Sequence, residues 1–258
     1  MIRLGFRHYK NLILHKAWAD FRAEAERTYL GVVWWVLDPL INMAIYYLVF
    51  GVFLQMKTND FIPFLLTGLV VWRFIEATVV RASNSILQNV TMVRQVAFRK
   101  IIFPLIAVGT CMMEYVFSLA LLVVVLLICG YRPGVTWLAA PLVLLVELAF
   151  VLAMSLPLAV VVTFVPDVGK LISQLLRILF YLSGIFYTAK RLPPPMVPWL
   201  KLNPAIHIVE GMRDVLMYGV WPNWTALGVV GLLSVLVAGG GWLLIRRFDP
   251  LFAKRIAR

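Results

Sequence analysis

The stretch RTYLGVVWWVLDP, residues 27–39, lies where a charged segment gives way to an apolar one. The apolar character continues to residue 56, with Asp38 as its single charged side chain. An apolar run of about 20 residues can cross a hydrocarbon core about 30 Å thick as a helix, and tryptophan is enriched at membrane edges. The stretch therefore predicts a transmembrane helix over residues 32–56.

The composition extends this prediction to the whole chain. Its 258 residues are 62% hydrophobic and 14% charged, with a mean hydropathy of +0.91, which is far above that of a water-soluble domain. Five further apolar runs follow the first, and all are continuous rather than alternating, which favours helices over a β-barrel. We predict an all-α, polytopic membrane protein, a single domain over residues 1–258, with six spans at 32–56, 61–83, 103–130, 136–165, 170–188 and 223–246.

The distribution of positive charge predicts the orientation of these spans. Most of the 24 lysines and arginines fall on the side of the membrane that carries both termini. Basic residues are retained on the cytoplasmic side, so we expect both termini to be cytoplasmic. The net charge of +12 could suggest nucleic acid, but the basic residues flank the spans, and phospholipid headgroups are the partner that this pattern favours.

Two polar segments are expected on the cytoplasmic side. Residues 4–27 have apolar side chains at helical spacing, from Phe6 and Tyr9 to Phe21, which is typical of a helix lying in the membrane interface. Residues 84–100 are basic and free of glycine and proline. They are either a short helix exposed for docking or a solvated basic loop between two spans.

A third polar segment, residues 189–222, is expected on the outer side. Four prolines exclude a regular helix from its first part, whereas Pro204 after Asn203 is a helix start signal for residues 204–218. The segment is too short and too polar to span. We therefore predict a re-entrant or surface-lying helical hairpin before the last span.

The sequence contains no ATP-binding motif. No GxxxxGK[ST] phosphate loop occurs, so ATP-driven work must come from another chain. Cys111 and Cys129 lie in one predicted span without metal or redox spacing, and we expect them to be small buried hydrophobic residues and no metal to be bound. His207 with Glu210 and Asp214 could form an acid/base cluster, although such residues more often solvate a surface helix.

Ionisable residues inside spans need partners because burying a lone charge is costly. Arg73 and Glu76 are three positions apart on one helical face and are expected to pair. Glu114 and Glu147 have no partner in their own spans, so each requires one from another helix.

Two stripes of side chains indicate a path. Aromatic and amide groups follow one face of the first span, and charge, amide and phenol follow one face of the fifth, which either packs on another helix or lines a path. Aromatic rings stack on the apolar faces of pyranose sugars, and sparse polar groups exchange hydrogen bonds with sugar hydroxyls, although tight helix packing also uses aromatic stripes. The predicted path residues are Trp34, Trp35, Asn42, Tyr46, Tyr47, Phe50, Phe53, Lys170, Gln174, Arg177, Tyr181 and Tyr187.

Three stretches give the chain a resemblance to a known family. They are RTYLGVVWWVLDPLINMAIYYLVFGVFL (27–54), NSILQNVTMVRQVAFRKIIFPL (84–105) and LNPAIHIVEGMRDVLMYG (202–219). Over nearly its full length the chain resembles the permease subunits of type 2 ABC exporters, which move lipid-linked polysaccharides such as O-antigen, capsule and wall teichoic acid. The resemblance implies a homodimer in a bacterial cytoplasmic (inner) membrane with two separate ATP-binding subunits, which hold the ATP and magnesium.

The resemblance also implies roles for individual residues. Leu30 and Gly31 match a hinge at which glycine lets the interface helix bend into the membrane. The outer-gate positions are Asn203, Pro204, His207, Glu210 and Arg213. The positions matching the ATPase contact are Glu24, Glu26, Arg27, Met92, Val93, Arg94, Gln95, Arg99 and Lys100.

These observations predict a non-enzymatic conduit. ATP-driven closure of the partner subunits would push on residues 84–100 and open a path lined by the first and fifth spans. The alternatives are a permease for a drug or lipid, a membrane enzyme acting on polyprenyl-linked sugars, and a structural scaffold.

Overall fold

The computed structural model describes residues 6–53, 55, 60–95, 99–187, 195 and 197–256, and these residues form helices and connecting turns without a strand. Short 3-10 and π-helical turns extend several helices, at Gly31–Val33, Tyr47–Phe53, Val135–Ala139 and Asp214–Tyr218. The α-helices are α1 (Phe6–Glu26), α2 (Trp34–Tyr46), α3 (Phe61–Gln88), α4 (Val90–Gln95), α5 (Ile102–Ile128), α6 (Ala140–Phe164), α7 (Asp167–Leu182), α8 (Val197–Lys201), α9 (Pro204–Arg213) and α10 (Trp224–Ile256).

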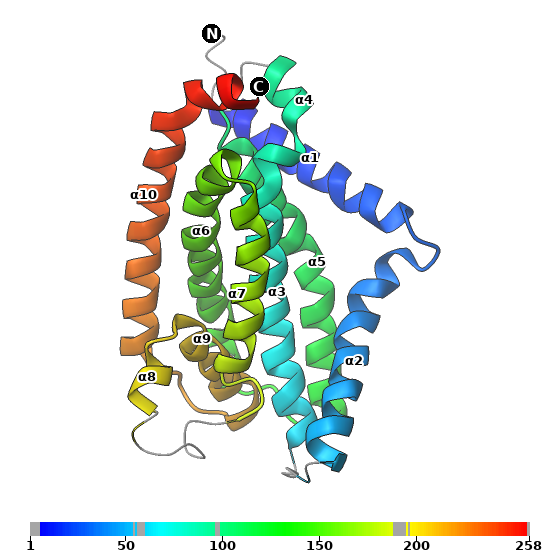
Figure 1. Ribbon diagram of the computed structural model, residues 1–258. Helices are drawn as coiled ribbons and strands as arrows, with labels where there is room; N and C mark the ends of the chain where they lie inside the picture. Colours follow the sequence, from blue (N-terminus) through cyan, green and yellow to red (C-terminus); the bar gives the residue numbers. More distant parts are fainter. Residues whose placement is uncertain are drawn as a thin grey trace.

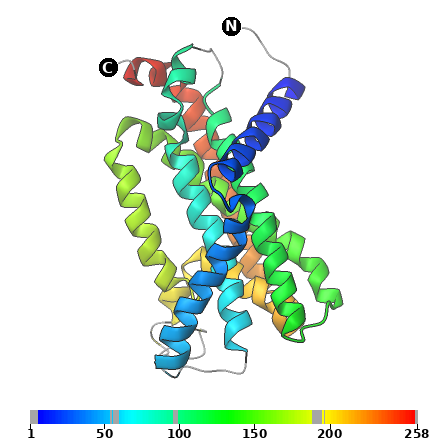
Figure 2. The same cartoon turned by 90° about the vertical axis from the view of Figure 1, so that its right-hand side faces the viewer.

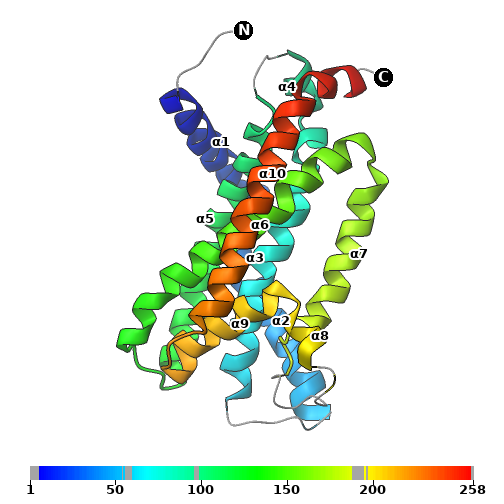
Figure 3. The same cartoon turned by 90° about the vertical axis from the view of Figure 1, so that its left-hand side faces the viewer.

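Five helical segments of the described chain are long and apolar enough to cross a membrane. They are Gly31–Phe53, Phe61–Gln88, Ile102–Ile128, Val135–Phe164 and Trp224–Phe252, and they confirm an all-α polytopic membrane protein. The run expected at 170–188 is α7, which has 16 residues and lies alongside the bundle (Figures 1 and 3). Its length of about 24 Å is less than a full crossing needs, so the count of six spans stays a prediction.

Helix α3 is the centre of the bundle. It contacts α2, α5, α6, α7 and α9, and the side chains from Pro63 to Trp72 are all buried, as expected for a stretch of helix that is apolar all round. On the far side of α6 lies α10 (Figure 1). A Cβ atom at Gly241 of α10 would lie 2.7 Å from Cδ of Pro157 in α6, so glycine is what lets the two backbones approach so closely.

Helix α1 joins α2 through a sharp bend at Gly31. Its φ of +49° belongs to the left-handed region that glycine occupies without strain, and its main-chain N–H lies 3.1 Å from Thr28 Oγ1. Figures 1 and 2 show the chain changing direction here, as predicted. Ala17 and Phe21, on the expected apolar face of α1, are buried, and Ala17 packs against α5. That face is therefore covered in part by protein, and its position in a membrane interface stays a prediction.

Proline 39 interrupts the hydrogen bonding of α2, and α5 compensates. A proline has no N–H to donate to the carbonyl four residues earlier, which leaves the carbonyl of Trp35 without its helical donor. Ser118 Oγ of α5 donates to this oxygen at 3.1 Å. The polar group that the proline releases is thus satisfied inside the membrane bundle, as it must be where no water is present.

The first residues of the predicted docking segment, 84–88, belong to the long membrane helix α3. Helix α3 continues to Gln88, and the short helix expected within 84–100 is α4. The side chain of Lys100 is buried, and its main-chain N–H donates to Asp249 of α10 at 3.0 Å. Helix α4 and the last turns of α10 share one end of the bundle, here called the terminal end (Figure 1).

Helices α8 and α9 lie at the opposite end, here called the hairpin end (Figure 1). Helix α9 begins at Pro204 as predicted, and Asn203 Oδ1 accepts from the main-chain N–H of Ala205 at 3.1 Å. The helical path continues through the π-helical turn to Tyr218. Four apolar side chains of this helical path, Ile208, Met212, Val215 and Leu216, are all buried. Residues 188–194 and 196 of the expected hairpin lie outside the described part of the chain.

Candidate functional site

The two predicted stripes meet in one groove. A cavity of about 240 Å³ lies between α2, α3 and α7. Asn42 and Tyr46 line it from α2, and Arg177 and Tyr181 line it from α7. We call it the path groove. Helix α3 forms its floor, and the remaining lining residues are Pro39, Leu69, Trp72, Arg73, Glu76 and Phe180.

One wall of the path groove is aromatic: Tyr46, Phe180 and Tyr181 line it, and their rings pack on the buried ring of Phe186, which is not itself a lining residue. The Phe186 ring centroid lies 4.6 Å from that of Phe50, 5.0 Å from that of Tyr46 and 5.9 Å from that of Tyr181. The main-chain carbonyl of Tyr181 accepts from the Tyr187 hydroxyl at 3.0 Å. Phe186 was not among the predicted path residues because it does not fall on the three- and four-residue spacing of the stripe. The wall therefore consists of the faces and edges of aromatic rings, and its polar groups are the tyrosine hydroxyls.

One ion pair on the polar side of the groove differs from the pair expected from the sequence. Arg73 forms an ion pair with Asp38 of α2, and not with Glu76 as its spacing suggested. The prediction was wrong because a partner on the neighbouring helix is within reach of the guanidinium. Asn42 Nδ2 donates to the main-chain carbonyl of Asp38 at 2.8 Å. Glu76 and Arg177 line the same groove, so its polar groups come from all three helices.

Several predicted path residues lie outside the groove. Trp35 is buried, stacks on Phe21 of α1 at 4.6 Å and does not line the path groove, so its assignment to a path stays a prediction. Trp34 lines a different cavity together with Trp35. The Tyr47 ring packs against Phe61, whereas Phe53 is exposed.

Helix α7 presents a polar stripe to its surroundings. Lys170, Gln174, Arg177 and Tyr181 are all exposed, while its other faces carry buried and exposed apolar side chains. A stripe of charge, amide and phenol on a membrane helix requires a polar neighbour or a wet cavity. Of the four stripe residues named here, Arg177 and Tyr181 line the path groove, and Lys170 and Gln174 do not.

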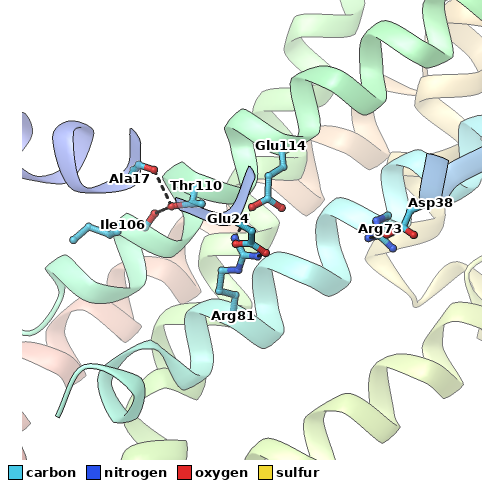
Figure 4. A network of polar contacts seen from close by, with 8 residues as sticks. All are labelled: Ala17, Glu24, Asp38, Arg73, Arg81, Ile106, Thr110 and Glu114. Carbon is cyan, nitrogen blue, oxygen red and sulfur yellow. Dashed lines mark hydrogen bonds and ion pairs between the residues drawn. The ribbon is translucent and has the colours of Figure 1, made fainter. Parts of the chain in front are cut away.

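Ion pairs at Arg81 join α1, α3 and α5, and the separate pair of Arg73 with Asp38 joins α2 to α3 (Figure 4). Arg81 of α3 lies 2.8 Å from Glu24 of α1 and 2.5 Å from Glu114 of α5. These groups and the Arg73–Asp38 pair line a cavity of about 300 Å³ between α1, α2, α3 and α5. The expected partner for Glu114 on another helix is therefore Arg81.

Glu147 also has the expected partner from another helix. Its Oε2 accepts from the Tyr115 hydroxyl of α5 at 3.0 Å, and both side chains are buried. Cys111 is buried as predicted, but Cys129 follows the end of α5 and is exposed, which corrects the prediction for that residue. Within the described ranges, no group of three or more His, Cys, Asp or Glu side chains could hold a metal ion.

The residues expected to contact an ATPase differ in their surroundings. Glu24 faces Arg81 of its own chain, and Glu26 pairs with Arg22 at 2.7 Å. The side chain of Lys100 is buried, and its predicted contact role stays a prediction. The exposed members of the set are Glu24, Glu26, Arg27, Met92 and Arg99, and the side chains of Val93, Arg94 and Gln95 lie outside the described part.

Arg213 lies inside the protein rather than at an exit. Its guanidinium is buried and donates to the main-chain carbonyls of Phe64, Gly184 and Ile185 at 2.8–3.2 Å. Burial lowers its pKa to about 9, which leaves the group charged at neutral pH. Gly68 makes room for it, because a Cβ there would lie 2.7 Å from Arg213 Nη2. Arg213 thus fastens α9 to the start of α3 and the end of α7.

The other predicted gate residues make local contacts at the hairpin end. Asn203 Nδ2 donates to Ser183 Oγ at 3.0 Å, which ties the start of α9 to the end of α7. His207 Nε2 lies 2.8 Å from the main-chain oxygen of Lys201 in α8. Pro204 and Glu210 are partly buried.

Comparison with known proteins identifies the family. A family model described as ABC-2 type transporter matches residues 12–217. The chain is 22% identical over 236 residues to the O-antigen export system permease protein RfbA of Klebsiella pneumoniae, covering 91% of each chain. It is 25% identical over 243 residues to the protein of that name from Myxococcus xanthus, covering 92% of this chain and 93% of the relative. It is 24% identical over 260 residues to the polysialic acid transport protein KpsM of Escherichia coli, covering 95% and 96%. The family model spans well over half of these 258 residues, and the chain belongs to the ABC-2 type transporter family.

Proposed function

We propose that this chain is the permease subunit of an ATP-driven exporter that carries a lipid-linked polysaccharide of the O-antigen or capsular type across a bacterial cytoplasmic membrane. The names of its relatives support this substrate class, because two describe O-antigen export and one describes polysialic acid transport. The observation that carries the proposal is the path groove, in which Tyr46 and Tyr181 from two helices converge on a shared aromatic wall. Aromatic faces with sparse polar groups can hold a sugar chain weakly enough for it to slide.

The working unit is a homodimer of this chain with two ATP-binding subunits. Closed twofold dimers are the commonest form of soluble oligomer, and the polar stripe of α7 supports a second copy because that stripe requires a cover. ATP and magnesium belong to the partner subunits, and this chain holds no cofactor. Both termini are cytoplasmic, so the terminal end faces the ATPase and the hairpin end faces outward.

The chain acts as a conduit rather than as an enzyme. ATP binding stabilises one state of the partner subunits, and that state favours an open arrangement of α2 against α7. The hairpin residue best suited to acid/base chemistry is His207, but its Nε2 is engaged by the main-chain oxygen of Lys201. Alanine at His207 should therefore leave substantial export.

Export from cells that lack their own copy of the permease tests the proposal. Tyr46→Ala with Tyr181→Ala should lower the surface polysaccharide about fivefold or more, since each lost aromatic contact is worth about 0.5–1.5 kcal/mol and the two together about 1–3 kcal/mol. Trp242→Ala on α10 is the matched control, because that ring is partly exposed away from the groove, and it should export normally. Full export by the double variant at normal protein levels would overturn the proposal. Loss of a drug or lipid export activity instead of polysaccharide would favour the alternative substrate.

A further inference from the structure

A second groove lies on another face of the bundle. A cavity of about 550 Å³ is bounded by α6, α10 and the α8–α9 hairpin, which lie together in Figure 3, while α2 and α7 bound the path groove. Its walls are almost entirely apolar and include Phe150, Met154, Val229 and Leu233. We call it the hairpin groove. Since its lining residues are not those of the path groove, it is a separate site.

The length of the hairpin groove matches one lipid leaflet. Its lining on α10 runs from Thr225 to Val237, which at a rise of about 1.5 Å per residue is about 18 Å. Half of a hydrocarbon core is about 15 Å thick. Val229, Leu233 and Val237 are all at least half exposed, so no helix among the described residues covers this side of α10. An extended acyl chain would cover these side chains along their whole length.

The hairpin end of the groove carries positive charge. Lys201 is exposed and lines the groove beside His207, whose ring lies 2.8 Å from the main-chain oxygen of Lys201. The α9 helix begins next to them at Pro204, so the positive end of its dipole points the same way. Glu210 and Asp214 are not among the lining residues, and no carboxylate is. An apolar slot with a cation at its mouth suits a lipid with a negatively charged headgroup.

We propose that the hairpin groove binds an anionic membrane phospholipid, with the phosphate at Lys201 and an acyl chain along α6 and α10. The lipid would hold the hairpin against α6 and α10 on the side opposite to Arg213, which fastens the same hairpin to α3 and α7. The position of the hairpin would then depend on the lipid composition of the membrane. This site goes beyond the proposed export function and does not depend on which molecule is exported.

Retention of lipid by the purified full-length chain tests the site. The protein in detergent is supplied with phosphatidylglycerol or phosphatidylcholine of the same acyl chains, and bound lipid is counted by native mass spectrometry. The parent should retain phosphatidylglycerol in preference. Lys201→Gln should lower that retention about fivefold, because a basic residue near a lipid surface contributes about 1 kcal/mol. Lys201→Arg should retain it.

Two further variants test whether the retained lipid is bound in the hairpin groove or elsewhere on the protein surface. Arg132→Gln removes an exposed cation in the α5–α6 connection, outside the groove, and should leave retention unchanged. Ala226→Phe fills the apolar part of the groove and should lower the retention of both lipids. Size-exclusion chromatography identifies any variant that fails to fold.

Three outcomes would overturn the proposal. One is equal retention of the two lipids by the parent chain, and another is undiminished phosphatidylglycerol on folded Lys201→Gln protein. The third is preferential retention of an added polyprenyl phosphate with exclusion of phosphatidylglycerol, which would assign the groove to another lipid class. None of these outcomes involves export, so they leave the proposed function unaffected.

Discussion

The guanidinium of Arg81 in α3 lies 2.8 Å from the carboxylate of Glu24 in α1, although 57 positions separate them in the sequence. The same guanidinium lies 2.5 Å from Glu114 of α5. One cation therefore joins the first helix to the centre of the bundle through two carboxylates. Any displacement of α1 must stretch this contact or carry α3 with it, so the contact couples the terminal helix to the path groove's floor.

Removing Arg81 should destabilise the bundle. Arg81→Met leaves Glu114, whose side chain is only 15% exposed, without its cation, which should cost about 1–3 kcal/mol of unfolding free energy. Thermal unfolding in detergent measures the loss. The paired change of Arg81→Met with Glu114→Gln should recover part of it, because the remaining group is neutral. Equal stability of Arg81→Met and the parent would contradict the assigned role of the contact.

The bend at Gly31 should not tolerate a side chain. Gly31→Ala forces a residue with a Cβ to adopt φ of +49°, at a cost of about 1–3 kcal/mol, and brings that Cβ to 2.9 Å from the main-chain oxygen of Ala25. We expect lower thermal stability and weaker export. Gly228→Ala is the matched control in α10, where nothing lies within 4 Å of the added Cβ, and it should be neutral or slightly stabilising. An export-competent, fully stable Gly31→Ala protein would show that the bend is not required.

Much of this fold could be predicted from the sequence, because apolar run length alone locates the long membrane helices. The fifth run was predicted to reach residue 188, but α7 ends at Leu182. Gly184 has φ of +66° and lies just beyond the helix end, where left-handed glycine terminates helices. A glycine within an apolar run does not reveal by itself whether the helix passes through it or stops.

Tertiary pairings in the site could not be predicted from local spacing. The three-residue spacing places Arg73 and Glu76 on one face of α3. The guanidinium of Arg73 nevertheless forms its ion pair with Asp38 of α2. Trp35 is on the predicted stripe, yet α1 folds back at Gly31 and covers it with Phe21. Helical periodicity shows which residues share a face and cannot show which neighbour that face meets.

The hairpin should depend on the planar geometry of Arg213. Arg213→Lys keeps the charge, but a single ammonium cannot reproduce the donors that now reach Phe64, Gly184 and Ile185, so we expect a loss of about 1–3 kcal/mol. Gly68→Ala should have a similar effect from the other side of the contact, because its Cβ would meet the guanidinium. Thermal unfolding of both variants, with Gly239→Ala as an uncrowded control, checks this. Parent-like stability of Arg213→Lys would show that the hydrogen bonds to these carbonyls do not hold the hairpin.

The two cysteines offer a test of orientation. Cys129 is exposed just beyond the end of α5, at the hairpin end, whereas Cys111 is buried within that helix. A membrane-impermeant maleimide should therefore label one thiol in sealed right-side-out vesicles if the hairpin end faces outward, as the distribution of basic residues predicts. Cys129→Ser should abolish this labelling, and its remaining thiol should react only after unfolding in detergent. Labelling of Cys129 in inverted vesicles alone would reverse the predicted orientation, and would turn α4 and the ion pairs at Arg81 away from a cytoplasmic ATPase.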